Sequence, residues 1–178
     1  MRTTPLDTSK PGVKLVEPDV ERDADVSMHW LVGDLGVATL LAMGVPAKNI
    51  SEPHIDNEVQ RIKDFIANPD QLNWTILYEE NPVGAVWVDL RPVDTVHAPA
   101  IHIMIGDLEV RGKGVGQASI SAVAKHLQSL GHNIIYSRHL ISNSGAAKLL
   151  QRIGFRNDGE TYTDKDSLEW QNVKLLFK

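Results

Sequence analysis

Three glycines and two cations lie within a few residues of one another, and together they have the chemistry of an anion-binding loop. They belong to the stretch Val110-Arg111-Gly112-Lys113-Gly114-Val115-Gly116. An apolar run over 100–105 precedes this stretch, and apolar residues at helical spacing follow it over 117–130. Glycine lets a ligand approach the backbone closely, and the start of a helix offers free N–H groups at its positive dipole end. The order strand, loop, helix therefore predicts a cradle for a diphosphate.

The glycine spacing distinguishes three kinds of phosphate-binding loop. Glycines at 112, 114 and 116 do not fit G-x-G-x-x-G, the dinucleotide fingerprint. The ATP-binding P-loop needs Ser or Thr after Gly-Lys, but Gly114 follows Lys113. Arg111, Gly114 and Gly116 do match Arg-x-x-Gly-x-Gly, which resembles the pyrophosphate loop of the GCN5-related N-acetyltransferases (the GNAT family) that bind acetyl-coenzyme A. Taken alone, these residues also suit a surface turn that connects a strand to a helix.

A second motif strengthens the resemblance. The stretch 143–155 is similar to the family's Asn-x-x-Ala-x-x-Leu-Tyr-x-x-x-Gly-Phe segment, and it reads Asn143-Ser144-Gly145-Ala146-Ala147-Lys148-Leu149-Leu150-Gln151-Arg152-Ile153-Gly154-Phe155. In the family this asparagine ends the fifth strand and contacts the cofactor, although Asn143 and Ser144 are also good helix N-caps. The two motifs stand in the family's order and spacing over 100–156. Before residue 72 the resemblance rests on element order.

Hydrophobic periodicity and the resemblance together predict an α+β fold with a mixed, mostly antiparallel sheet of six to seven strands and helices on both faces. Residues 1–12 are expected to form a flexible tail, and 13–178 a single acetyltransferase domain. Strands are expected at 13–16, 74–78, 83–90, 100–105, 134–141, 155–162 and 168–177, and helices from Asp19 or Asp23 through Leu31, then at 37–43, 52–67, 117–130 and after Asn143. In the family the fourth and fifth strands run parallel and splay apart. The unpaired backbone near Ile105 can then bind the pantetheine arm like an added strand.

Composition restricts the function classes. With no cysteine in 178 residues, the chain has no disulfide, no cysteine–zinc site and no thiol nucleophile. Its net charge of −5 argues against general nucleic-acid affinity, and we see no cluster spaced for a metal. No run approaches the roughly 20 apolar residues of a membrane-spanning helix, and the N-terminus lacks a signal-peptide core, so we expect no membrane partner and a cytoplasmic location. Either a monomer or a homodimer suits these features.

The resemblance implies acetyl-coenzyme A as co-substrate and assigns its site. The residues expected to bind it lie at the end of the central strand, in the glycine loop and before the last motif's helix: Met104, Ile105, Gly106, Arg111, Gly112, Lys113, Gly114, Val115, Gly116 and Asn143. The acceptor is expected to be a primary amine, on a small molecule or a protein N-terminus. Direct attack on the thioester is expected, since the chain has no cysteine and no serine in a G-x-S-x-G context.

The catalytic groups are less clear, because the sequence departs from the family pattern at one position. Where the family commonly holds the tyrosine that protonates the leaving thiolate, this chain has Leu150. A non-catalytic module that binds acyl-coenzyme A is therefore the alternative to the enzyme, and a nucleotide-binding domain is disfavoured by the glycine spacing. Ser142 is the first replacement candidate, unless it is only a turn residue or cap. His139 is the second, and His139 and His102 are alternatively buried core histidines.

Overall fold

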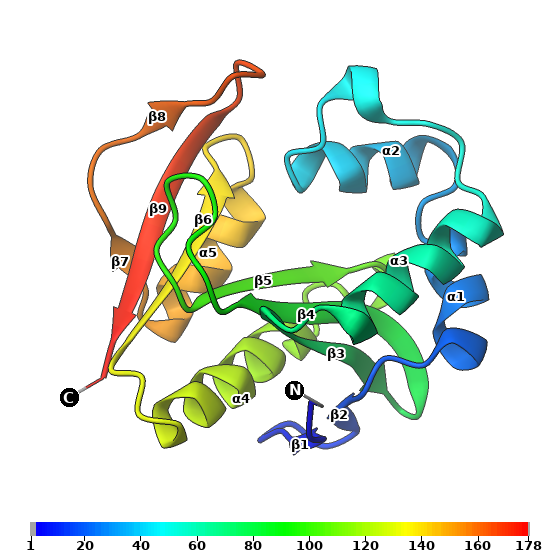
Figure 1. The fold of residues 1–178 in the computed structure, drawn as a ribbon, viewed down its shortest axis with the longest axis horizontal. Coiled ribbons are helices and arrows are strands. Elements are labelled where there is room, and N and C mark those ends of the chain that lie inside the picture. The colour runs from blue at the N-terminus through cyan, green and yellow to red at the C-terminus, as the bar shows by residue number, and fades with distance from the viewer. Residues whose placement is uncertain (1–2, 178) are drawn as a thin grey trace.

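One mixed sheet of nine strands organises the chain (Figure 1). A computed structural model describes residues 3–177. The strands are β1 (Leu6–Asp7), β2 (Val13–Val16), β3 (Gln71–Tyr78), β4 (Asn81–Asp89), β5 (Ala100–Ile105), β6 (Ile134–Leu140), β7 (Arg156–Asn157), β8 (Tyr162–Thr163) and β9 (Glu169–Leu176). The helices are α1 (Val20–His29), α2 (Gly33–Ala42), α3 (Ile55–Ala67), α4 (Val115–Ser129) and α5 (Ser144–Ile153), with short 3-10 turns η1 (Ala47–Asn49) and η2 (Leu108–Val110).

Strand order explains why the sheet opens in its middle. The strands lie in the order β1-β2-β3-β4-β5-β6-β9-β7, and β8 also pairs with β9. Each of these pairs is antiparallel except β5 with β6, which run parallel. In the described part of the chain, their ladder consists of Ala100 opposite Tyr136. Beyond this point β5 and β6 separate, so the carboxyl-terminal half of β5 has a free edge.

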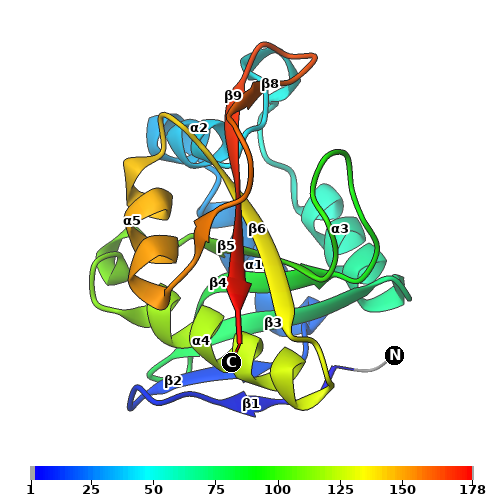
Figure 2. The same cartoon turned by 90° about the vertical axis from the view of Figure 1, so that its left-hand side faces the viewer.

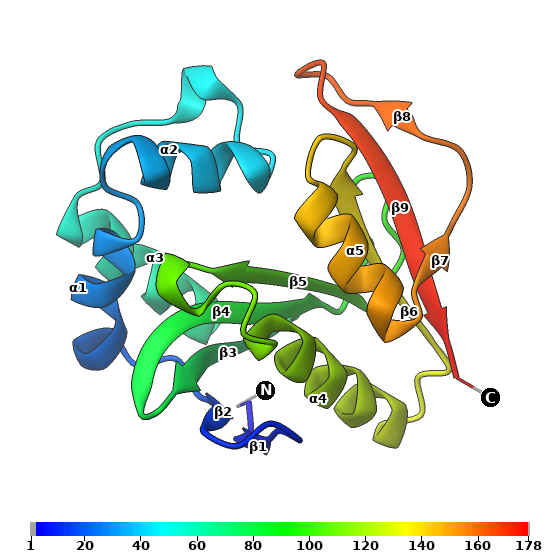
Figure 3. The ribbon, with the colours of Figure 1, turned by 180° about the vertical axis from the view of Figure 1, so that it is seen from behind.

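Helices cover both faces of the sheet, as Figure 2 shows edge-on. Alternate residues of β3 point to opposite faces, which is the period of a strand. Trp74 packs edge-on against His126 of α4, with ring centroids 6.0 Å apart. On the other face Asn73 donates from Nδ2 to the Phe65 carbonyl of α3 at 2.9 Å, and Thr75 donates to the Asp23 carboxylate of α1. Seen from behind, α4 and α5 lie together on the first of these faces (Figure 3).

The core lies between the sheet and α4. Its fully buried members include Leu15, Trp74 and Ile76 from the sheet and Val123 and Leu127 from α4. The buried residues of α4 recur at the helical period and those of β3 at the strand period, which is why the sequence pattern predicts both elements. This packing fixes the start of α4 next to the open edge of β5.

The predicted fold class is confirmed, and two local predictions are corrected. From Thr3 onward the expected flexible tail packs against the sheet: Leu6 and Asp7 pair with β2, and the indole of Trp74 donates to the Thr4 carbonyl at 2.8 Å. The strand expected at 155–162 is instead two short strands, β7 and β8, on either side of a turn at Gly159, where φ is +82°. Without the three two-residue strands β1, β7 and β8, the sheet has the predicted six.

Candidate active site

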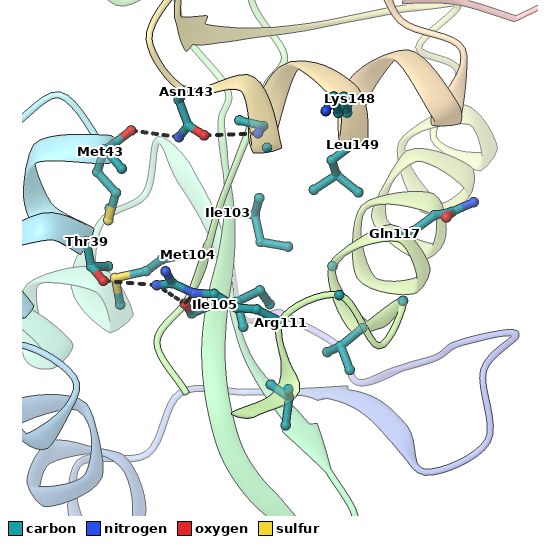
Figure 4. A pocket seen from close by; sticks show the side chains of 18 of the residues that line it. Thr39, Met43, Ile103, Met104, Ile105, Arg111, Gln117, Asn143, Lys148 and Leu149 are labelled. Carbon is teal, nitrogen blue, oxygen red and sulfur yellow. Dashed lines mark hydrogen bonds between the residues drawn. The ribbon is translucent and has the colours of Figure 1, made fainter. Parts of the chain in front are cut away.

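A groove of about 440 Å³ lies in the opening between β5 and β6 (Figure 4). Its walls come from four parts of the chain that are far apart in sequence: the end of α2, the free edge of β5, the glycine loop with the first turn of α4, and one side of α5. Because the groove follows the free edge of β5, a long ligand in it would run from the loop at one end to Met43 and Met104 at the other.

The glycine loop has the conformation of an anion cradle. Gly112 and Gly114 have φ of +79° and +81°, in the left-handed region that glycine adopts without strain. Space around them is open: a Cβ on Gly112 would have no neighbour within 4 Å, and one on Gly114 would meet the Lys10 side chain at 3.9 Å. Gly114 is also the N-cap of α4, so no side chain caps the first turn. The N–H groups of that turn therefore face the groove at the positive end of the helix.

The free edge of β5 supplies hydrogen-bonding backbone. The N–H of Gly106 donates to Val83 of β4 at 2.9 Å, so the alternate residues Ile105 and Ile103 direct their N–H and C=O groups away from β4. Nearer the closed end, the Ser137 hydroxyl donates to the Ile101 carbonyl at 2.8 Å. An extended chain laid beside this edge would find the N–H and C=O of Ile103 and the N–H of Ile105, as in β-strand addition, whereas the Ile105 carbonyl already accepts from Arg111.

Most of the predicted binding residues line this groove. They are Met104, Ile105, Arg111, Gly112, Gly114, Val115, Gly116 and Asn143. Gly106 does not line the groove. Packing explains why this position is a glycine, since a Cβ there would overlap the indole ring of Trp30 at about 2.1 Å. Lys113 is exposed and does not line the groove either. The structure therefore places neither Gly106 nor Lys113 in the groove, although both were predicted to contact the ligand.

Two of the lining residues use their side chains differently from the prediction. Arg111 donates from Nη2 to the Ile105 carbonyl at 2.7 Å and to Thr39 Oγ1 of α2 at 2.9 Å. Asn143 accepts from Ala146 N–H at 3.0 Å as the cap of α5, and donates from Nδ2 to the Ala42 carbonyl at 2.9 Å. Both side chains therefore tie α2 to the two sides of the groove, as Figure 4 shows. In this structure their side-chain hydrogen bonds connect the groove walls to α2.

Sequence reasoning did not name the residues that two helices contribute to the groove. Thr39 and Met43 bring the α2 segment to the groove, although this segment carries no recognisable motif. Lys148, Leu149 and Arg152 line it from α5. Their spacing of three and four residues is a helix face with two cations on it, and this signal was available in the sequence.

The catalytic candidates lie in different places. Ser142 is exposed and lines a small cavity beside the groove together with Leu41 and Ala42. That cavity shares Ala42, Asn143 and Gly145 with the groove. His139 instead faces a separate cavity between α5 and β9, and its Nδ1 lies 2.9 Å from the Leu140 carbonyl. The structure thus brings Ser142, and not His139, next to the groove.

Leu150 is a residue of the hydrophobic core. It is 4% exposed, belongs to the main hydrophobic cluster and faces the cavity that holds His139. The neighbouring Leu149 is the residue that faces the groove. A leucine at 150 is therefore explained by packing, and the general acid must come from another residue or from water.

Residues 3–177 hold neither a metal site nor a membrane-spanning helix. No group of three or more His, Asp or Glu side chains there is arranged to hold a metal ion. None of the helices in the same range is long and apolar enough to cross a bilayer.

Comparison with known families decides what this groove belongs to. The family model described as acetyltransferase (GNAT) domain matches residues 18–156, which include the glycine loop, the Asn143 motif and the α1–α2 region. The chain belongs to the GNAT acetyltransferase family. A relative from Methanocaldococcus jannaschii, named an uncharacterized protein, is 32% identical over 96 residues, or 52% of this chain and 19% of that protein. This GNAT chain thus matches a small part of that relative's length.

Solved GNAT structures share the fold over nearly the whole chain. RimL, a ribosomal L7/L12 alpha-N-protein acetyltransferase in complex with coenzyme A, has a TM-score of 0.77 at 13% identity, covering 96% of this chain and 97% of that one. MccE, a microcin C7 self-immunity acetyltransferase in complex with acetyl-CoA and AMP, has a TM-score of 0.72 at 16% identity, covering 94% of each chain. The predicted family and fold are therefore confirmed, and neither comparison supports the non-catalytic alternative.

Proposed function

We propose that this protein transfers the acetyl group of acetyl-coenzyme A to a primary amine, on a small molecule or a protein N-terminus, by direct attack. The observation that carries the proposal is the groove, which joins an uncapped helix start to the free edge of a splayed strand. Family membership supports acetyl transfer with acetyl-coenzyme A as co-substrate. The name of RimL, an alpha-N-protein acetyltransferase, supports an amine acceptor, and the name of MccE specifies no acceptor group, so both kinds of amine stay open.

The residues present fit acetyl-coenzyme A. The N–H groups of the first turn of α4 would hold the diphosphate, and the open space at Gly112 and Gly114 admits it. The outward N–H and C=O groups of Ile103 and the N–H of Ile105 would hold the amide-containing arm, since the Ile105 carbonyl already accepts from Arg111. One of these N–H groups is also placed to stabilise the negative charge that develops on the carbonyl oxygen. When bound, acetyl-coenzyme A supplies the activated acyl group and a thiolate leaving group.

A panel assay tests this function. We expect free thiol to be released from acetyl-coenzyme A in the presence of at least one member of a panel of primary amines and N-terminal peptides. Peptides with a free α-amine and the same peptides blocked at that amine form the matched pair, since only the free form can attack. Intact-mass measurement without acceptor should show no acetylated protein, because attack is direct. Tight binding of acetyl-coenzyme A without turnover on any acceptor would refute the proposed function. An acetylated protein that loses its acetyl group when acceptor is added would refute direct attack.

Ser142 is proposed to assist the leaving thiolate, directly or through a water, because its cavity adjoins the groove. Ser142→Ala should lower kcat at least about tenfold and leave the affinity for acetyl-coenzyme A unchanged, since general-acid assistance contributes about 100- to 10,000-fold and a water can replace part of it. Ser144→Ala is the control, because Ser144 is the next hydroxyl along the chain and lines the same cavity without lining the groove. Equal kcat in the parent and Ser142→Ala would leave Ser142 as a turn residue.

A further inference from the structure

A histidine–aspartate pair lies on the strand that forms the groove edge. His102 of β5 places Nε2 3.0 Å from Oδ2 of Asp89 on β4. The other oxygen of Asp89 accepts from Gln71 Nε2 at 2.6 Å. The imidazole stacks on the indole of Trp87, with ring centroids 5.4 Å apart and planes 19° from parallel. The ring is therefore stacked on Trp87 on one face, and its Nε2 lies within ion-pair distance of Asp89.

The two ring nitrogens of His102 have different surroundings. Nε2 is buried and, although it lies 3.0 Å from Asp89, it makes no hydrogen bond of ordinary geometry there; 20% of the His102 side chain and 12% of the Asp89 side chain are exposed. Within residues 3–177 no group donates to or accepts from Nδ1. The pair with Asp89 fixes which nitrogen faces inward, so Nδ1 is the nitrogen that a ligand or a water can approach.

His102 does not itself line the groove, but it lies on the same sheet face as Met104, which does. His102 and Met104 are two residues apart on one face of β5, which is about 7 Å along a strand, and Met104 lines the groove. The parallel register, Ala100 opposite Tyr136, places Arg138 of β6 across the opening from His102. The diphosphate loop adjoins α4 on the other face, so an amine reaching His102 would approach the groove from the opposite side (Figures 1 and 3).

The charged and titratable groups around this face come from three elements. Asp89 lies on β4. Tyr136 and Arg138 lie on β6, and the loop between β4 and β5 adds Asp94, 3.4 Å from the Arg138 guanidinium, and His97, whose ring packs 5.2 Å from that of Tyr136. From α3 the neighbour is apolar, since Phe65 packs on Trp87 at 5.9 Å. The carboxylates partly balance Arg138, so a cationic ammonium does not meet a uniformly positive face.

We propose that His102 is the base that deprotonates the acceptor ammonium, directly or through one water, and that Asp89 is its positioning residue. The inference rests on the proposed acetyl transfer. The ammonium gives one proton to Nδ1, which leaves a neutral amine and an imidazolium. The nitrogen lone pair then bonds to the thioester carbonyl carbon as the C–S bond breaks, with its electron pair leaving on sulfur. The second nitrogen proton goes to that thiolate, and the imidazolium releases its proton to solvent.

The environment of Asp89 suits this role. Burial raises the pKa of Asp89, but the adjacent His102 imidazole, the hydrogen bond from Gln71 and the nearby Arg138 charge outweigh burial and hold that pKa below its ordinary value. Asp89 thus stays ionised at neutral pH and stabilises the imidazolium that forms at Nε2–H. A neutral residue at 89 would leave that charge without its carboxylate.

The test uses the full chain, acetyl-coenzyme A and an acceptor found with the panel assay. His102→Gln should lower kcat/KM about 100-fold or more near neutral pH and leave the calorimetric affinity for acetyl-coenzyme A unchanged. The acidic limb of its pH–rate profile should move to higher pH, where the amine loses its proton to solvent unaided. His29→Gln is the control, because His29 is an exposed histidine at the end of α1. A His102→Gln variant with the parent's rate and limb would overturn the inference.

Asp89→Asn gives a second, independent test that keeps the imidazole. Its acidic limb should move to lower pH, because the imidazolium loses its carboxylate, and its neutral-pH kcat should fall while KM for acetyl-coenzyme A holds. Asp89→Glu should recover part of the rate and of the limb position. If the acidic limb of the pH–rate profile stayed at the parent's pH in Asp89→Asn, Asp89 would have only a structural role, and the proposed cooperation of His102 with Asp89 would be refuted. Absence of turnover in the parent, by contrast, removes the proposed function itself.

Discussion

Replacing Gly114 by aspartate should abolish measurable binding of acetyl-coenzyme A. Gly114 ends the loop with φ of +81° and caps α4, so a carboxylate there would stand where the first-turn N–H groups face the groove. The added bulk and negative charge oppose a diphosphate. We expect the dissociation constant to rise at least about 100-fold, which corresponds to about 2.7 kcal/mol. Calorimetric titration with acetyl-coenzyme A measures this directly.

Two variants separate this effect from its alternatives. Gly131→Asp places the same side chain at another left-handed glycine, with φ of +94° and no neighbour within 4 Å, beyond the far end of α4. It should match the backbone strain of Gly114→Asp and keep the affinity. Lys113→Ala removes an exposed cation and should weaken binding by less than about fivefold, because exposed ion pairs contribute about 0.2–1 kcal/mol. Unchanged affinity in Gly114→Asp would refute the backbone cradle.

The sequence could predict the site where function depends on the backbone. A left-handed Gly114 and a helix start are local features, so the spacing of the glycines was enough to predict the loop and the uncapped helix start. Side-chain roles depend on tertiary neighbours. Arg111 and Asn143 carry the motifs, yet both reach α2, which lies about 70 and 100 residues earlier in the chain. No local pattern in α2 indicates that Arg111 and Asn143 contact it, so these contacts could be found only in the structure.

The same distinction holds for the fold. The long strands and helices have strong periodicity, and they lie where the pattern puts them, as α4 and β5 show. The amino-terminal segment was predicted wrongly because its composition is polar and rich in turn residues. Its place on the sheet comes from contacts that are distant in sequence, such as Trp74 with Thr4 and Thr3 with Asn73. Two-residue strands such as β7 form by pairing with a longer strand, here β9, and two residues are too few to show the alternating pattern of a strand.

Adjacent leucines at 149 and 150 offer a decisive test of how α5 is oriented. Leu150 is buried in the main cluster, so Leu150→Ala should lower the free energy of unfolding by roughly 2–5 kcal/mol, the range for leucine-to-alanine changes in cores. Leu149 is only partly buried and faces the groove, and its Cδ2 would lie 3.4 Å from a Cβ on Gly116. Leu149→Ala should therefore cost less stability than Leu150→Ala.

Binding should respond in the opposite order. Leu149→Ala removes apolar contact from the groove wall and should weaken acetyl-coenzyme A about three- to tenfold, or about 0.7–1.4 kcal/mol. Leu150→Ala should keep its affinity at temperatures where it remains folded, since its side chain faces the cavity with His139 on the other side of α5. Urea unfolding followed by circular dichroism gives the stabilities, and calorimetry gives the affinities. If Leu150→Ala instead lost affinity with little loss of stability, position 150 would face the thioester as the family's tyrosine does, and α5 would be rotated from the orientation described above.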